Sequence, residues 1–207
     1  ENAIRPDDIH DPVSRMVIVE NTHNRCGGTV LPLEYTREVA DLAHRNNLHL
    51  HLDGARVFNA AAALGVDAKE ITRHVDSVTF CLSKGLCAPV GSVVCGTREF
   101  IKRGLRIRKV LGGGMRQAGV LAAAGIISLE KMTKRLGEDH ARASALAAGM
   151  ASIPGIIFEM SMPQTNMVFP CLTDDVRLAT REVAERLNEL GVNVGVVATG
   201  RFRLVGH

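Results

Sequence analysis

Residues 80–86 (FCLSKGL) form an apolar run that leads into Lys84 and then into a glycine turn. Upstream, residues 48–56 (LHLHLDGAR) follow the same pattern: an apolar run leads into Asp53, and Arg56 lies in the turn that follows. Both runs have the length and composition of β-strands. In open α/β sheets, functional residues gather beyond the carboxyl ends of the strands. We therefore expect Lys84 and Asp53 to share one edge of a sheet.

A strand that ends in aspartate and a later strand that ends in lysine are the arrangement expected of an enzyme that uses pyridoxal 5'-phosphate (PLP). The lysine amine forms a Schiff base with the cofactor aldehyde, and the aspartate pairs with the protonated pyridine nitrogen. Lys84 stands between two apolar runs, which predicts a buried amine that loses its proton readily. Simpler roles stay open, because Lys84 could be a solvated charge and Asp53 could cap the following helix.

Arg56 lies close enough to Asp53 to reach the same ligand. Its planar guanidinium matches the geometry of a carboxylate or another oxyanion. The alternative is an ordinary surface arginine at the start of a helix. The histidines His49 and His51 alternate with leucine on the same run, and no third ligand stands at metal spacing. We therefore expect core histidines and no metal.

The remaining chain predicts strands that alternate with helices. We expect strands at 16–20, 48–52, 77–82 and 91–96, and helices at 33–46 and 58–64. This alternation favours an α/β fold with a mostly parallel sheet covered on both faces. Residues 115–150 predict a long alanine-rich helix interrupted near Gly137. We place the large domain at residues 1–130.

The last part of the chain predicts a small α+β domain at residues 131–207. Its expected strands are 155–160, 164–169, 192–197 and 201–205, and its expected helix, 174–190, has an acidic N-terminal end that suits the helix dipole. The chain begins without methionine and ends abruptly after the last strand. We expect it to be part of a longer protein.

Composition describes an ordinary globular protein, with 46% hydrophobic and 23% charged residues among 207. A net charge of +3 and an aromatic content of 3% favour neither a nucleic-acid nor a membrane partner. The five cysteines form no CxxC pair, which indicates free thiols in a reducing compartment such as the cytoplasm. The basic stretch at 102–116 is interpreted as a solvated helix face.

Several motifs of this chain together resemble the low-specificity L-threonine aldolases. They are residues 51–56 (HLDGAR), 83–92 (SKGLCAPVGS) and 111–119 (LGGGMRQAG), with 20–23 (ENTH) and 203–207 (RLVGH) at the two edges. The similarity covers essentially the whole chain, in order. That family has the fold of the fold-type I PLP enzymes. The resemblance therefore implies the C-terminal portion of a PLP-binding large domain, followed by a small domain that is incomplete at its end.

The resemblance also implies roles for individual residues. Lys84 matches the Schiff-base lysine, Asp53 the partner of the pyridine nitrogen, Arg56 an arginine near cofactor and substrate carboxylate, and Arg203 the arginine that clamps that carboxylate. His23 matches a histidine near the active site, and the resemblance implies Lys109 as the one ligand-facing member of the basic stretch at 102–116. The implied activity is that of a carbon–carbon lyase, the cleavage of L-threonine or L-allo-threonine to glycine and acetaldehyde, in threonine catabolism and glycine biosynthesis. Family members are typically tetramers built from dimers, so the resemblance implies a homo-oligomer, a dimer or a homotetramer, for the full-length form.

Two alternatives to an active aldolase stay open. The phosphate-binding loop and the side chain that stacks on the cofactor ring are expected upstream of this chain, so these residues alone should bind PLP weakly and lack useful activity. The chain could then be a catalytically incompetent fragment or splice form that pairs with a full-length subunit. A different fold-type I enzyme, such as a β-eliminating lyase or a decarboxylase, is disfavoured by the glycine-rich stretch 111–117.

Overall fold

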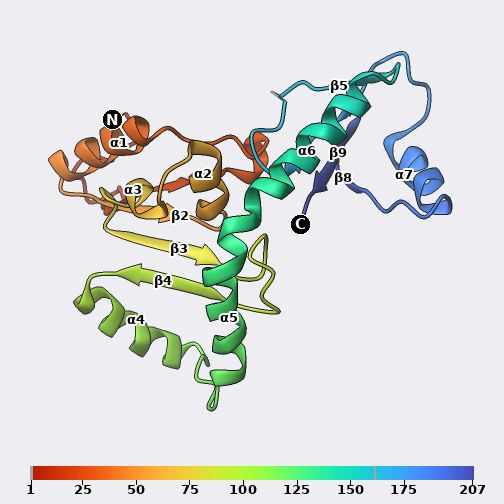
Figure 1. Ribbon diagram of the computed structural model, residues 1–207. Helices are drawn as coiled ribbons and strands as arrows, with labels where there is room; N and C mark the ends of the chain where they lie inside the picture. Colours follow the sequence, from red (N-terminus) through yellow and green to blue (C-terminus); the bar gives the residue numbers. More distant parts are fainter. Residues whose placement is uncertain (1, 161) are drawn as a thin grey trace.

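The structure, a computed structural model, describes residues 2–160 and 162–207 and contains two β-sheets joined by a long helical run (Figure 1). The first sheet has the strand order β1 (Met16–Glu20), β2 (His49–Asp53), β3 (Ser77–Cys81) and β4 (Ser92–Gly96). The pairs β1–β2 and β2–β3 are parallel, and β3–β4 is antiparallel. The predicted α/β fold with a mostly parallel sheet is confirmed.

One face of this sheet carries the core of the first half of the chain. Leu50 and Leu52 of β2 are fully buried, because alternate residues of a strand point to the same face. Leu50 packs with Ala40 and Ala43 of α1 (Leu33–Arg45). Leu52 packs with residues of α2 (Val57–Leu64) and α3 (Ala68–Ile71). The helix predicted at 33–46 therefore forms, starting after Pro32 as expected of a residue with a fixed φ.

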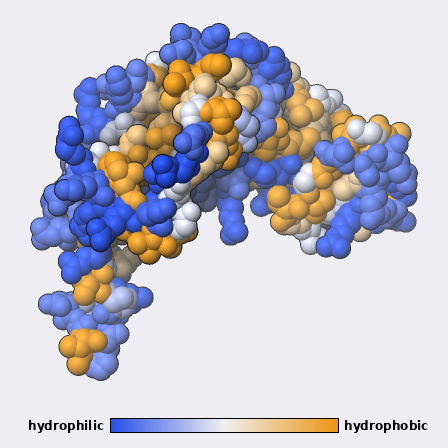
Figure 2. Space-filling model, turned by 90° about the horizontal axis from the view of Figure 1, so that it is seen from below, coloured by the Kyte–Doolittle hydropathy of each residue, from blue (hydrophilic) through white to orange (hydrophobic). Residues whose placement is uncertain are grey.

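The opposite face of the sheet is open at β1, so the prediction that helices cover both faces is wrong for the described residues. Met16 is 50% exposed and Ile18 is 58% exposed. The reason is that α1, α2 and α3 all contribute to the core on the Leu50 and Leu52 face. Figure 2 shows hydrophobic side chains in several patches of the surface, among hydrophilic ones.

A helical run connects the two sheets. It consists of α5 (Gly119–Lys131), the 3-10 turn η2 (Met132–Arg135) and α6 (Leu136–Ala151), which follow one another almost end to end (Figure 1). The predicted interruption near Gly137 is confirmed: η2 ends two residues before Gly137, which itself lies in the first turn of α6. The domain boundary at residues 130/131 falls inside this run and remains a proposal.

The helix α4 (Arg98–Val110) precedes this run and contains no buried residue. Thr97 caps it by accepting a hydrogen bond from the Phe100 amide at 3.2 Å. The predicted solvated helix face of the basic stretch is thus confirmed for the part that α4 covers. Within the described chain, no helix is both long enough and apolar enough to cross a membrane.

The second sheet is antiparallel and small. It contains β5 (Ile156–Ile157), β7 (Cys171–Leu172), β9 (Arg201–Val205) and β6 (Met167–Val168), with β8 (Gly195–Ala198) paired to β9. The strands predicted at 155–160 and 164–169 shrink to two residues each, and Pro170, which lacks an amide donor, separates β6 from β7. The helix predicted at 174–190 is shorter than expected: α7 spans Thr180–Glu189.

Candidate functional site

The carboxyl ends of β1, β2 and β3 meet at one edge, because these strands run parallel and in register. Glu20 pairs with Asp53, and Asp53 pairs with Thr79. Lys84 lies in the turn after β3, where its carbonyl accepts a hydrogen bond from the Cys87 amide at 2.8 Å. The expectation that Asp53 and Lys84 share one edge of the sheet is confirmed.

The position of Lys84 differs from the prediction in one respect: its side chain is half-buried rather than buried. The adjacent Gly85 is buried, and a side chain there would approach Leu136 of α6 to 3.0 Å and Asn59 of α2 to 3.4 Å. The glycine therefore lets the Lys84 turn pack closely against these helices.

Asp53 does not cap the next helix. Its Oδ1 accepts a hydrogen bond from the Ala55 amide at 3.0 Å, which fixes the turn after β2. The helix α2 begins at Val57, and its N-cap residue, Arg56, makes no side-chain capping bond. The capping alternative for Asp53 is wrong, and the half-buried carboxylate is held at the strand end with Oδ2 unused by any donor of the described residues.

Arg56 is buried, with 7% of its surface exposed, so the surface-arginine alternative is wrong. Burial lowers the pKa of its guanidinium, and the nearby charge of Arg203 on β9 lowers this pKa further. Glu20, Cys81 and Asp53 act in the opposite direction. The Nε atoms of both arginines are buried and meet no acceptor in the parts of the chain that the structure describes. Two neighbouring guanidiniums whose buried Nε donors lack an acceptor are suited to bind an anion such as a carboxylate.

Glu20 also belongs to the site, although its motif, residues 20–23, assigns it no role. Its Oε1 accepts a hydrogen bond from the Asn24 amide at 3.0 Å, and its Oε2 lies 3.3 Å from His23 Nε2. His23 Nδ1 is buried and has no partner among the described residues. The sequence does indicate a site position for Glu20, because Glu20 ends the apolar run of β1 in the same way as Asp53 ends the run of β2.

The model of the beta-eliminating lyase family matches residues 1–173. The chain belongs to this family. It is 44% identical over 204 residues to the low specificity L-threonine aldolase of Escherichia coli (strain K12), covering 99% of this chain and 58% of that protein. It is 43% identical over 196 residues to low-specificity L-threonine aldolase 1 of Arabidopsis thaliana, covering 95% of this chain and 55% of that protein.

Solved structures show the same fold. A threonine aldolase from Leishmania major superposes with a TM-score of 0.75 at 19% identity, over 96% of this chain and 57% of that one. The architecture is that of the fold-type I PLP enzymes. The chain spans a little more than half the length of these two aldolases.

The two histidines of β2, His49 and His51, have different surroundings. His51 Nδ1 lies 2.8 Å from Ser77 Oγ and its Nε2 lies 3.4 Å from Thr79 Oγ1, but the residue is half-buried on the face opposite Leu50 and Leu52, so the predicted core position is wrong for His51. His49 is not a core residue: its side chain is 76% exposed, 3.8 Å from Asp76. Among the described residues, no three His, Cys, Asp or Glu side chains form a metal-binding group.

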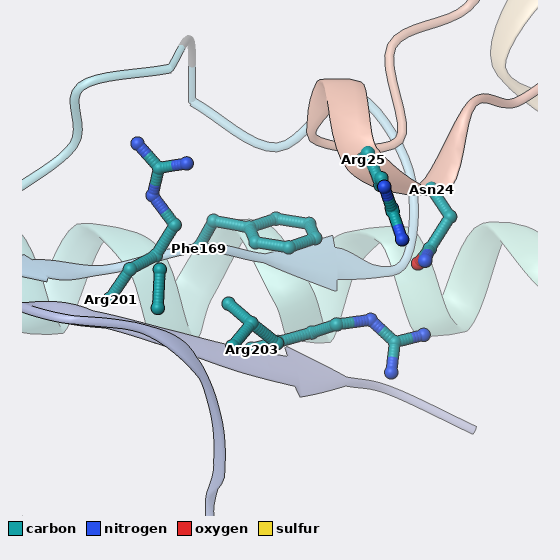
Figure 3. A pocket seen from close by; sticks show the side chains of 7 residues that line it. Asn24, Arg25, Phe169, Arg201 and Arg203 are labelled. Atoms are coloured by element: carbon teal, nitrogen blue, oxygen red, sulfur yellow. The ribbon is translucent and has the colours of Figure 1, made fainter.

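A cavity of about 510 Å³ opens between the second sheet and the 3-10 turn η1 (Asn24–Cys26) that follows β1. Figure 3 shows Asn24 and Arg25 pointing from η1 toward the guanidinium of Arg203, with the ring of Phe169 beside them. Arg201, Val197 and Ala198 complete the lining. No sequence pattern assigns a role to Asn24, Arg25 or Phe169. The Lys109 amine lies beside Gly114, beyond α4, and its contact with a ligand stays a prediction.

Proposed function

We propose that this chain carries the catalytic centre of a PLP-dependent threonine aldolase, a lyase that cleaves L-threonine or L-allo-threonine to glycine and acetaldehyde. The observation that carries the proposal is the shared edge of Asp53 and Lys84, beside which Arg56 and Arg203 approach each other. The named relatives support the same reaction. Threonine breakdown, with glycine as product, would be the metabolic role.

The residues at this edge fit PLP. Lys84 would hold the cofactor covalently through its amine, and Asp53 would accept a hydrogen bond from the pyridinium nitrogen through the free Oδ2. PLP, when bound, supplies the electron sink that stabilises the charge left on Cα when the Cα–Cβ bond breaks. An aspartate on a strand end, fixed by the Ala55 amide, is a rigid partner for such a ring.

Arg56 and Arg203 would bind the substrate carboxylate between them. The anion would remove the mutual repulsion of the two guanidiniums and give their buried Nε donors an acceptor. Because the carboxylate is fixed from two directions, the bond to be cleaved is also held in one orientation, which is a positioning contribution to the rate. The arrangement uses residues of both sheets, so the substrate would lie between them.

The decisive experiment traps the cofactor on its lysine. The purified chain is incubated with PLP and reduced with borohydride, and the labelled peptide is identified by mass spectrometry. We expect the label on Lys84 and none in Lys84→Ala. The matched control, Lys69→Ala, removes an exposed lysine of α3 and should leave labelling intact. Glycine formation from L-allo-threonine, measured with the same variants, tests the reaction itself. Labelling spread equally over Lys69 and Lys84 would contradict the proposal.

A second candidate function is that of a partner for a longer subunit of the same enzyme. The exposed apolar side chains Met16 and Ile18 lie on β1, an edge strand of the first sheet, and an open edge of this kind is suited to pairing. The active species would then be a dimer or tetramer that combines shorter and longer chains. The free cysteines favour a reducing compartment such as the cytoplasm. Mixing the chain with a full-length subunit and measuring mass and activity together would test this candidate.

A further inference from the structure

The cavity between η1 and the second sheet is lined by more arginines than are required to bind one carboxylate. Arg25, Arg201 and Arg203 line it. Of these three arginines, only Arg201 has a carboxylate partner among the described residues, Glu159. The Nε atoms of Arg201 and Arg203 are buried without an acceptor there. If Arg203 shares a carboxylate with Arg56, the charge of Arg25 remains unused.

The side chains around Arg25 also offer an acceptor. Asn24 Oδ1 is buried and meets no donor among the described residues. Figure 3 shows that Asn24 and Arg25 point toward Arg203 from the opposite wall of the cavity. A ligand that fills this space therefore needs an anionic group for the guanidiniums and a hydroxyl or ammonium donor for the Asn24 carbonyl.

The size of the cavity also favours a ligand with a second charged group. The side chain of threonine ends in a methyl group, which is small and makes no use of an arginine. A cavity of about 510 Å³ that is lined by Arg25 and Arg203 has room for a longer, charged substituent. The remaining wall is formed by the side chains of Val197, Ala198 and Phe169. These side chains are apolar and offer the arginines no hydrogen-bond acceptor.

We propose that this cavity is a subsite for a second carboxylate, in which Arg25 and Asn24 bind the side chain of a dicarboxylic β-hydroxy-α-amino acid. This inference rests on the proposed function, since the α-carboxylate would lie between Arg56 and Arg203. Cleavage of a four-carbon substrate of this class gives glycine and a two-carbon oxo acid. The hydroxyl loses its proton, the electron pair of the Cα–Cβ bond moves to Cα, and Cα takes up a proton.

The test measures binding of two four-carbon acids by calorimetry, without PLP. Malate and 2-hydroxybutyrate share a hydroxyl and one carboxylate and differ in the second carboxylate. We expect the unmodified chain to bind malate at least tenfold more tightly. In Arg25→Gln this ratio should fall to about two or less, and in Arg25→Lys it should be largely retained. Arg25 is exposed and makes no side-chain hydrogen bond to a described residue, so the fold should tolerate both changes.

The matched control is Arg15→Gln, the same chemical change at the opposite end of β1. It should leave the ratio unchanged, because the lost charge is remote from the cavity. A malate preference that persists in Arg25→Gln, or that falls equally in Arg15→Gln, overturns the subsite and leaves the Lys84 labelling result untouched. Absence of label on Lys84, with a preference that Arg25→Gln abolishes, overturns the aldolase and leaves the subsite.

Discussion

Arg56, in the turn after β2, lies near Arg203 of β9, and the charge of Arg203 lowers the pKa of the buried Arg56 guanidinium. Neither makes a side-chain hydrogen bond to any residue that the structure describes, and each has a buried Nε without an acceptor. Two like charges held together in a desolvated place oppose folding. Such an arrangement is typical of a site in which stability has been given up for the binding of a ligand.

We predict that Arg203→Gln weakens ligand binding without weakening the fold. Loss of one guanidinium should raise the Kd for 2-hydroxybutyrate roughly thirtyfold, or about 2 kcal/mol, as for other truncated charge pairs in protein interfaces. The free energy of unfolding in urea should be unchanged or higher, because the repulsion with Arg56 disappears. Arg45→Gln, at the exposed end of α1, should change neither quantity. A destabilised Arg203→Gln with normal binding would contradict this account.

A second prediction concerns the dependence of stability on pH. Burial lowers the pKa of His140 on α6 from its ordinary value of 6.5. Its Nε2 lies 3.1 Å from Asn59 Nδ2, so the neutral ring, with its proton on Nδ1, accepts a hydrogen bond from the helix beside the Lys84 turn. Because the folded pKa is the lower one, the unfolded chain binds more protons as the pH falls below 6.5.

This part of the stability is therefore present above about pH 6.5 and is lost as the pH falls toward the folded pKa. We expect His140→Gln, which keeps an acceptor but cannot be protonated, to flatten the decline of the free energy of unfolding between about pH 7 and pH 5.5. The control His207→Gln changes an exposed residue at the end of the chain and should keep the decline. Equal declines in both variants would exclude His140 as the titrating group.

A third prediction tests the core of the first sheet. Leu52 is fully buried, and Leu52→Ala should lower the free energy of unfolding by about 2–5 kcal/mol, because it removes apolar contacts and leaves a cavity. Met16 is 50% exposed on β1, and Met16→Ala should cost no more than about 0.5 kcal/mol. The comparison uses urea unfolding followed by circular dichroism. Similar losses for both would mean that the open face of β1 is covered in solution.

Local sequence patterns predict the first sheet well because its strands and helices are determined by residues that are close together in the sequence. The strand expected at 16–20 matches β1, and the helix expected at 33–46 matches α1 to within one residue. Apolar runs, the fixed φ of Pro32 and the alternation of burial along β2 depend only on neighbouring residues. The same reasoning placed Asp53 and Lys84 at one edge, since strand direction follows from the alternation of strands and helices.

Longer-range contacts explain where these predictions were wrong. The amphipathic pattern of 174–190 predicts a helix, but the amide of Thr173 donates to the Gly155 carbonyl and the Val176 amide donates to the Thr173 carbonyl, which holds a turn there. The helix α7 consequently begins at Thr180. No local pattern reports that Arg25 of η1 and Arg203 of β9 line one cavity, because that requires the position of one sheet relative to the other.

The last prediction tests that contact between the two sheets, at Gly28. Its φ of +73° favours glycine, and a Cβ there would lie 2.7 Å from Met167 Cε and 3.0 Å from Thr165 Oγ1. Thr165 Oγ1 also donates to the Gly28 carbonyl at 3.1 Å. The turn after η1 is thus packed directly against β6, and the wall of the cavity that carries Asn24 and Arg25 depends on this packing.

Gly28→Ala should combine two penalties: about 1–2 kcal/mol for an alanine with positive φ and about 1–3 kcal/mol for the overpacked contact with Met167. Gly65→Ala is the matched control, because Gly65 has a φ of +66° but nothing within 4 Å of an added Cβ, so only the first penalty applies. Gly28→Ala should also weaken malate binding severalfold, since it moves η1 away from β9, and Gly65→Ala should not. Equal stabilities of the two variants would show that η1 is not held against the second sheet.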